Sequence, residues 1–253
     1  MPPDMKCLPH LPEALAHASI EEIEALEALL RDKLAGWRMR RFFQDEGPLR
    51  RALYARHLAF FKAGATHRER CFMAGNRVGK TIGGAYETAL HLTGRYPAWW
   101  EGRRFDGPIQ AWAAGKSLET TRDIVQLELY GPPGQPGTGM VPTDDIAKAR
   151  PRAGANGALD YLCVRHQGGG ESVIGFKSYD QGRKAFEGTA RHWVWLDEEP
   201  PVAVYNECLT RTATTQGLIA ITFTPLEGAT EVVLDFLTKG VVVGGDGGAA
   251  GVA

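Results

Sequence analysis

The stretch CFMAGNRVGKTIGGAYETALHL, Cys71 to Leu92, contains an apolar run, a glycine-bearing loop and a helical pattern, in that order. The residues Cys71–Ala74 are typical of a buried strand, and the pattern from Thr81 onward predicts a helix. A triphosphate site needs backbone N–H groups at a helix N-terminus, a lysine that reaches the β- and γ-phosphates, and a hydroxyl for magnesium. The residues GNRVGKT supply all three, so they predict a phosphate-binding loop for a nucleoside triphosphate.

This loop departs from the usual pattern G-x-x-x-x-G-K-[ST] at one position. Ala74 stands where the first glycine is expected, and Gly75, one position later, can supply the flexible backbone instead. A bare Gly-Lys-Ser also occurs at 115–117, where QAWAA runs straight into it, and we interpret that copy as an ordinary strand-to-helix turn. The same interpretation stays open for residues 75–81 taken alone. The expected nucleotide-contacting residues of the loop are Gly75, Asn76, Arg77, Val78, Gly79, Lys80 and Thr81.

A second pattern, HWVWLDEEPP, places two acids at the end of an apolar strand. Magnesium takes oxygen ligands, and the water that attacks a γ-phosphate needs to be oriented. We expect Asp197 to hold magnesium, directly or through water, and Glu198 to polarise the attacking water. The alternative is that both acids only cap a strand where it meets solvent. GTPase motifs are not found in workable positions, so the pattern favours an ATPase with an additional catalytic glutamate.

The third pattern is LIAITFTPLEG, an apolar strand that ends in hydroxyl residues. If this strand lies beside the strand of the phosphate loop, Thr222 and Thr224 are placed to sense the γ-phosphate. They would then couple its loss to the movement of another part of the protein. The alternative is an ordinary strand end without a role in coupling.

Beyond Arg70, short apolar runs alternate with helical stretches, which predicts an α/β fold of the P-loop NTPase class. We expect a mostly parallel, RecA-like sheet flanked by helices, with one antiparallel hairpin that turns at Gly168–Gly170. The expected strands are Cys71–Ala74, Ile109–Ala114, Ser172–Phe176, Trp193–Leu196 and Leu218–Phe223, and the expected helices are Thr81–Leu92 and Ser117–Leu129.

Both ends of the chain differ in composition from this central region, 49–237. Residues 1–48 are expected to form a helical extension, because Ser19 and Glu22 have the form of a capping box and apolar residues then recur at helical spacing up to Trp37. That helix either packs on its own domain or serves as a partner-binding arm. Residues 238–253 are rich in glycine and are expected to be a disordered tail.

A basic segment precedes the phosphate loop. From Arg31 to Arg70 the sequence has eleven Lys or Arg residues against four Asp or Glu residues, with aromatic residues interleaved. Such a pattern is typical of a nucleic-acid surface, but a solvated basic face over an aromatic core gives the same pattern. Both interpretations stay open.

Overall composition excludes several classes of protein. The formal net charge of −1 gives no global attraction to nucleic acid, so any such contact must be local. The four cysteines are far apart and form no C-x-x-C pair, which argues against a zinc or disulfide framework. We find no signal peptide and no apolar run of membrane-spanning length, and therefore expect a soluble intracellular protein without membrane partners.

Three segments together resemble the ATPase domain of the large terminase subunit of tailed bacteriophages. They are RERCFMAGNRVGKT, GRKAFEGTARHWVWLDEEPP and ITFTPLEGATEVV, and the resemblance spans roughly Leu49 to Leu237. A variant phosphate loop is itself typical of that family. The resemblance implies an ATP-hydrolysing motor that pumps double-stranded DNA into a procapsid in the bacterial host cytoplasm. It also implies a ring of subunits that works with a portal protein and a small terminase subunit.

The resemblance implies a role for each matching residue: phosphate binding by Gly75 to Gly79 and Lys80, magnesium ligation by Thr81 and Asp197, catalysis by Glu198, and coupling by Thr222 to Thr224. Terminases also use an arginine that stabilises the transition state, and Arg77 and Arg183 are the candidates. Arg77 would act within its own subunit, and Arg183 from a neighbouring one. The aromatic and polar run before the loop makes Tyr54 and His57 candidate contacts for adenine.

Family members usually continue into a nuclease domain, whereas this sequence stops soon after Leu237 in the glycine-rich tail. We therefore expect no nuclease activity from this chain, and either a stand-alone motor or a truncated prophage copy. Two other functions stay open: a helicase-like DNA translocase that is unconnected with packaging, and a remnant that binds nucleotide without turning it over.

Overall fold

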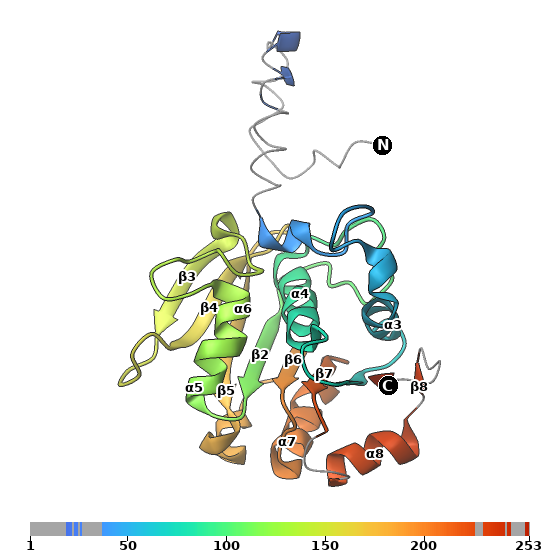
Figure 1. Cartoon of the computed structure of the whole chain (residues 1–253). Coiled ribbons are helices and arrows are strands. Elements are labelled where there is room, and N and C mark those ends of the chain that lie inside the picture. The colour runs from blue at the N-terminus through green and yellow to red at the C-terminus, as the bar shows by residue number, and fades with distance from the viewer. Residues whose placement is uncertain are drawn as a thin grey trace.

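The computed structural model of the chain describes residues 19–21, 23–24, 26, 37–225, 230–240, 242–243 and 251–252 (Figure 1). It has one sheet whose strands lie in the order β3-β4-β5-β2-β6-β7-β1-β9-β8. The strands are β1 (Glu69–Met73), β2 (Gln110–Gly115), β3 (Ile146–Pro151), β4 (Leu159–Arg165), β5 (Glu171–Ser178), β6 (Trp193–Asp197), β7 (Leu218–Phe223), β8 (Val242–Val243) and β9 (Gly251–Val252).

The five central strands, β5, β2, β6, β7 and β1, pair in parallel, and the pairs at either edge are antiparallel. The predicted mostly parallel α/β sheet is therefore confirmed. Strand β7 lies between β1 and β6, with Met73 opposite Phe223 and Asp197 opposite Thr222. Since these strands are parallel, the three segments that follow them meet at one edge of the sheet.

Helices cover the sheet on both faces. They are α3 (Ala55–Ala63), α4 (Lys80–Thr93), α5 (Leu118–Thr120), α6 (Leu127–Tyr130), α7 (Val202–Ala213) and α8 (Glu231–Lys239). A π-helical segment, η3 (Thr121–Gln126), joins α5 to α6. Helices α7 and α8 lie side by side at the bottom of Figure 1, and α4 and α6 cover the other face.

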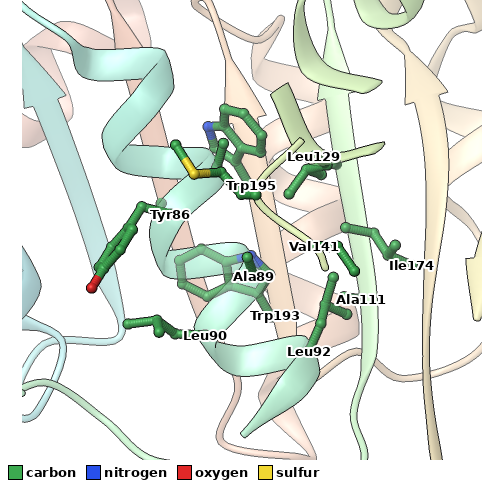
Figure 2. Packing of buried hydrophobic residues seen from close by; sticks show 14 of the residues in the cluster. Tyr86, Ala89, Leu90, Leu92, Ala111, Leu129, Val141, Ile174, Trp193 and Trp195 are labelled. Atoms are coloured by element: carbon green, nitrogen blue, oxygen red, sulfur yellow. The ribbon is translucent and has the colours of Figure 1, made fainter. Parts of the chain in front are cut away.

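Strand β6 shows how alternate residues serve two cores. Trp193 and Trp195 belong to the hydrophobic cluster under α4, and Val194 and Leu196 belong to the cluster under α7 and α8. Figure 2 shows both tryptophans beside α4. The helix approaches Trp195 so closely that a Cβ on Gly84 would lie 2.3 Å from the indole Nε1, so only glycine fits at this crossing.

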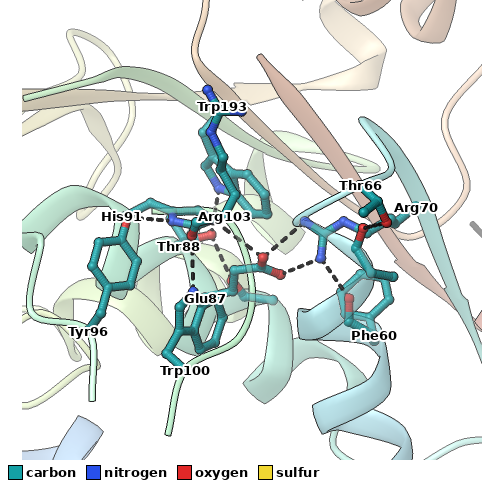
Figure 3. Close-up of polar contacts among 12 residues, drawn as sticks. Phe60, Thr66, Arg70, Glu87, Thr88, His91, Tyr96, Trp100, Arg103 and Trp193 are labelled. Carbon is teal, nitrogen blue, oxygen red and sulfur yellow. Dashed lines mark hydrogen bonds and ion pairs between the residues drawn. The ribbon is translucent and has the colours of Figure 1, made fainter. Parts of the chain in front are cut away.

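A buried ion pair also ties α4 to β1 (Figure 3). Arg70 Nη2 lies 2.9 Å from Glu87 Oε1, Arg70 Nη1 donates to the other carboxylate oxygen at 3.1 Å, and both side chains are fully buried. Burial raises the pKa of Glu87, but Arg70 and His91 outweigh it and hold the pKa below its ordinary value. Because removing one partner would leave a buried charge unpaired, this pair fixes the helix that follows the phosphate loop.

All the strands and helices expected in the central region are present, with ends shifted by a few residues, and β4 and β5 form the predicted hairpin. Strand β3 was not predicted. In its sequence IAKARP, alanine alternates with Lys148 and Arg150 and a proline ends the strand, which is common at sheet edges but gives no run of large apolar residues.

The chain ends are described only in part. Of the predicted N-terminal helix, residues 20–21, 23–24 and 26 are helical, and most of the rest lies outside the described residues. Helix α8 extends to Lys239, past the expected domain limit at 237. Within the predicted tail, β8 and β9 are short strands, and β9 pairs with β1, so these four residues differ from the disorder expected there. The domain limits stay a prediction.

Candidate nucleotide-binding and catalytic site

The predicted phosphate loop lies between β1 and α4. Helix α4 begins at Lys80, and its N-cap Gly79 has a left-handed backbone with φ 85°. Residues 75–78 are exposed, and Arg77 also has a positive φ of 63°. The loop therefore places exposed backbone at the N-terminus of a 14-residue helix, where the unpaired N–H groups and the helix dipole attract anions.

The two glycines of the loop differ in what they require. Gly75 has no positive φ, and a Cβ placed on it would meet no atom within 4 Å, whereas a Cβ on Gly79 would lie 3.3 Å from His57 Nε2. The expectation that Gly75 provides special backbone freedom is not supported by this geometry. The carbonyl oxygens of Ala74 and Gly75 instead accept hydrogen bonds from Lys80.

We therefore predict different outcomes for alanine at these two positions. Gly79→Ala should lower stability by about 1–2 kcal/mol and weaken nucleotide binding, because alanine disfavours φ 85°. Gly75→Ala should leave the melting temperature within about a degree of the parent. Thermal melts and nucleotide titrations of both variants check this, and equal tolerance at both positions would contradict the role given to Gly79.

Lys80 is held in place by three oxygen atoms. Its Nζ lies 2.9 Å from the Ala74 carbonyl oxygen, 2.6 Å from that of Gly75 and 2.8 Å from Thr224 Oγ1. Burial lowers the pKa of this lysine, and the nearby Glu198 and Asp197 oppose that effect. Thr224 in turn donates to Asn76 Oδ1 at 2.8 Å. The end of β7 is thus connected to the phosphate loop through the lysine and the asparagine.

Asp197 lies at the end of β6 and is 3% exposed. Its Oδ1 accepts hydrogen bonds from Thr222 Oγ1 at 2.7 Å and from Thr81 Oγ1 at 3.2 Å. Trp195 Nε1 donates to the same Thr222 hydroxyl at 2.8 Å, which orients it toward the carboxylate. Burial raises the pKa of Asp197 to about 7, despite the opposing hydrogen bond from Thr222.

The donor set of Thr81 and Asp197 fits magnesium. Burial raises the pKa of the Asp197 carboxyl although Lys80 is nearby, so a cation bound there would compensate its charge, and the Thr81 hydroxyl adds a second hard oxygen ligand. Magnesium is commonly held by one or two protein oxygens, with waters and substrate phosphates completing its shell. Within the described residues there is no group of three or more His, Cys, Asp or Glu side chains that could hold a metal by itself.

Glu198 follows directly and is exposed. Its backbone is left-handed, with φ 64°, an unusual conformation for a residue with a side chain. Its N–H donates to the Thr222 carbonyl oxygen at 2.8 Å, which keeps the residue beside β7. An exposed carboxylate next to a buried one suits a general base with access to water.

The remaining predicted residues lie in different surroundings. His57 is buried behind the phosphate loop, with Nε2 3.2 Å from the Gly79 carbonyl oxygen and its ring centroid 4.8 Å from that of Phe72. Burial lowers the pKa of this histidine. Tyr54 is half-buried, with its ring centroid 5.4 Å from that of His57. Their contact with adenine stays a prediction.

The two candidate arginines are separated. Arg77 is exposed on the phosphate loop itself. Arg183, at the start of η6 (Arg183–Phe186), pairs with Glu207 on α7 and with Glu187, each at 2.8 Å. The structure therefore brings Arg77 to the loop, and it holds Arg183 against α7 through ion pairs.

Two residues of the site were not identified from the sequence. Trp195 orients Thr222, and the Tyr179 hydroxyl lies within hydrogen-bonding distance of the backbone carbonyl oxygens of Asp197 and Glu198. The run WVWL, Trp193 to Leu196, indicates a buried strand, but it does not reveal that Trp195 donates a hydrogen bond to Thr222. Nothing in the local sequence around Tyr179 indicates which strand its hydroxyl reaches.

The part of the chain that the structure describes contains no helix with the length and apolarity that crossing a membrane requires.

Comparisons with known proteins identify the family of this chain. Residues 71–241 match the family model described as "Terminase large subunit, T4likevirus-type, N-terminal". The chain is 37% identical over 237 residues to the large terminase subunit of Salmonella phage P22, covering 86% of this chain and 46% of the relative. The chain thus spans about half the length of that curated relative.

Solved structures with a similar arrangement are also terminases. The ATPase domain of the Thermus phage P74-26 large terminase has 16% identity and a TM-score of 0.48, covering 72% of this chain and 68% of that one. The large terminase of another thermophilic bacteriophage, in complex with ADP, has 13% identity and a TM-score of 0.42, covering 82% and 41%. On the strength of the family model and the phage P22 relative, this chain belongs to the terminase large subunit family.

Proposed function

We propose that this chain is the ATP-hydrolysing motor domain of a DNA-packaging terminase, which couples hydrolysis to the translocation of double-stranded DNA into a procapsid. The observation that carries the proposal is the meeting of three segments at one edge of the sheet. They are the phosphate loop after β1, the acids that end β6, and the hydroxyl residues that end β7. Membership of the terminase large subunit family supports it.

The contacts of Lys80, Asp197 and Glu198 support a separate role for each residue in ATP hydrolysis. Lys80 exchanges its bonds to the loop carbonyls for the β- and γ-phosphates of ATP, since a phosphate oxygen is the stronger acceptor. Thr81 and Asp197 hold magnesium, which supplies charge neutralisation on the phosphates when bound. Glu198 accepts the proton of the attacking water, a contribution of about 10²- to 10⁴-fold.

The coupling role of β7 follows from its two hydroxyls. Thr224 bonds both Lys80 and Asn76 of the loop, and Thr222 bonds Asp197. A change in the position of either loop or acid is therefore passed to one strand and to α8, which follows it. Arg77 or Arg183 supplies the charge that stabilises the transition state; Arg183 first has to leave Glu187 and Glu207.

The test of this proposal is ATP hydrolysis by the purified chain. We expect release of phosphate that requires magnesium and stops when magnesium is chelated. Separation of duplex strands without dependence on a procapsid would favour the helicase-like translocase. ATP binding without turnover would establish the inactive remnant, and failure to bind ATP would contradict a nucleotide site altogether. A portal protein, a small terminase subunit, a ring of subunits and the bacterial cytoplasm belong to the same proposal.

In the structure, some of the cations in the basic segment Arg31 to Arg70 pair with acids of the same chain, which leaves fewer of them for a contact with DNA. Several of its cations are already paired: Arg38 with Glu128, Arg51 with Asp45, Lys62 with Glu101 and Arg70 with Glu87. Arg40 and Arg41 are exposed. Part of the segment thus makes contacts within the chain, which supports the second interpretation of its composition.

A second basic surface, which we call the edge face, lies on strands β3 and β5 and beside β2. Lys148 and Arg150 are exposed on alternate positions of β3 and face the same side. Lys177 Nζ and the guanidinium of Arg191 lie 5.0 Å and 4.3 Å from the ring centroid of Trp112. Burial lowers the pKa of Lys177, and Arg191 and Arg152 lower it further, so cations crowd here. We propose that DNA phosphates compensate this charge.

Double variants distinguish the two basic surfaces. Lys148→Ala with Arg150→Ala should weaken binding to duplex DNA and reduce the slope of log affinity against log salt by about two, one for each lost phosphate contact. Arg40→Ala with Arg41→Ala removes the same charge from the basic segment and should change the slope little. Fluorescence anisotropy at several salt concentrations checks this prediction. A larger change of slope in the Arg40 and Arg41 variant would show that the basic segment, and not the edge face, contacts DNA.

A further inference from the structure

Tyr179 is a buried tyrosine whose hydroxyl reaches the backbone of the catalytic acids. It begins the short η5 turn (Tyr179–Gln181) directly after β5 and is 6% exposed. The hydroxyl oxygen lies 2.9 Å from the carbonyl oxygen of Asp197 and 3.0 Å from that of Glu198. Its single proton is therefore shared between two successive backbone acceptors.

The reason for this contact lies in the sheet. Pairing of β6 with β2 stops at Leu196 opposite Ala114, one residue before Asp197. The β2–β6 pairing ends there, and buried carbonyl groups need a hydrogen-bond donor. Tyr179 follows β5, the strand beyond β2, and its hydroxyl supplies the donor.

The contact coincides with a strained backbone. Glu198 has φ 64°, and residues other than glycine keep such a conformation only where the surroundings enforce it. Two bonds enforce it here: the Glu198 N–H donates to the Thr222 carbonyl oxygen on one side, and Tyr179 donates to the Glu198 carbonyl oxygen on the other. The second bond restrains the peptide after Glu198 and thereby the direction of the Glu198 side chain.

We propose that Tyr179 is a positioning residue for ATP hydrolysis, which acts by holding the backbone of Glu198 so that its carboxylate points at the attacking water. This inference rests on the proposed function, because it takes Glu198 as the general base. The turn that carries Tyr179 is itself anchored, since Ser178 N–H donates to Gln181 Oε1 at 3.1 Å and Asp180 N–H donates to the Lys116 carbonyl oxygen at 3.3 Å. These hydrogen bonds hold the turn in place, and so they fix the position from which the Tyr179 side chain extends to the backbone of Glu198.

Phenylalanine at two buried tyrosines provides the test. Tyr179→Phe keeps the ring and removes the hydroxyl, and should lower kcat for ATP about 10- to 100-fold with KM changed less than about twofold, because orientation and not binding is lost. Tyr205→Phe is the matched control. Tyr205 belongs to the same hydrophobic cluster, is 5% exposed and donates its hydroxyl to Glu69 instead of the catalytic backbone. Its removal should leave kcat within about twofold.

Two further measurements exclude a general folding defect. Turnover is normalised to nucleotide-binding sites titrated with a fluorescent ATP analogue, so that misfolded protein does not enter kcat. In single-turnover assays, adding Tyr179→Phe to Glu198→Gln should cause no additional loss, because the positioned carboxylate is already absent. A normal kcat in Tyr179→Phe, or equal losses in both phenylalanine variants, would overturn the inference. If Glu198→Gln itself keeps full activity, the proposed function fails instead.

Discussion

Glu198→Gln should abolish steady-state ATP turnover, with kcat lower by about 10²- to 10⁴-fold, while ATP still binds. Glutamine has nearly the same shape but cannot accept the proton of the attacking water. The left-handed backbone and the contacts to Thr222 and Tyr179 involve only main-chain atoms of Glu198, so they survive the substitution. Phosphate release measures the turnover, and equilibrium titration with a fluorescent ATP analogue measures the binding.

The neighbouring Glu199 offers a control of identical chemistry. Its carboxylate accepts a hydrogen bond from Thr230, the N-cap of α8. Glu199→Gln removes the same charge one residue further along the chain and should keep turnover within a few-fold of the parent. Comparable losses in both variants would show that charge near the site matters, and not a general base at position 198.

Asp197→Asn should have two opposite effects: loss of magnesium-dependent turnover and higher stability of the protein in chelator at pH 8. Burial raises the pKa of Asp197 to about 7, compared with an ordinary value of 3.8. Below pH 4 the carboxyl is protonated in both folded and unfolded chains and costs nothing. As pH rises from 4 to 7, the unfolded chain ionises first, so this residue's contribution to stability is lost progressively.

The size of the effect follows from the shift of about 3 units, since each is about 1.4 kcal/mol. Asparagine avoids the cost, so its melting temperature should exceed that of the parent by roughly 8–16 °C at pH 8 and by little at pH 4. Melts of both proteins across this range, in chelator, test the prediction. A constant difference at all pH values would show that the asparagine stabilises by packing and that Asp197 ionises normally.

The central elements were predictable because their signals are local. Cys71–Ala74 and Trp193–Leu196 are apolar runs bounded by polar residues, and parallel strands buried on both faces produce such runs. Strand β3 lacks that signal, since an edge strand with one exposed face tolerates charge. The hairpin was recognisable from its glycines, of which Gly169 and Gly170 take positive φ values.

The residues of the candidate site could be predicted from the sequence, but the hydrogen bonds among them could not. Lys80, Thr81, Asp197 and Glu198 follow from short patterns, because phosphate and magnesium chemistry demands those residue types. The sequence did not indicate which of the two threonine hydroxyls, Thr222 or Thr224, bonds to which partner. Thr222 bonds Asp197 and Thr224 bonds Lys80, a difference that depends on strand register.

Other assignments changed because long-range contacts carry no sequence signal. Arg70 belonged to a basic segment in the sequence and is the buried partner of Glu87 in the structure. His57 was a candidate for adenine and lies behind the phosphate loop, where it contacts the Gly79 carbonyl oxygen. Burial gives both residues an internal partner that the sequence did not indicate, and the contact of His57 with adenine stays a prediction.

The stretch around Lys80 contains, in consecutive residues, the strand, turn and helix start that a phosphate loop needs, so local sequence was sufficient to identify it. The tertiary structure alone decided how that loop is joined to the acids that end β6. It placed β7 between β1 and β6, and it brought Tyr179 from the end of β5 to the carbonyl groups of Asp197 and Glu198. Strand order and register arise from packing among distant segments, and no pattern of neighbouring residues encodes them.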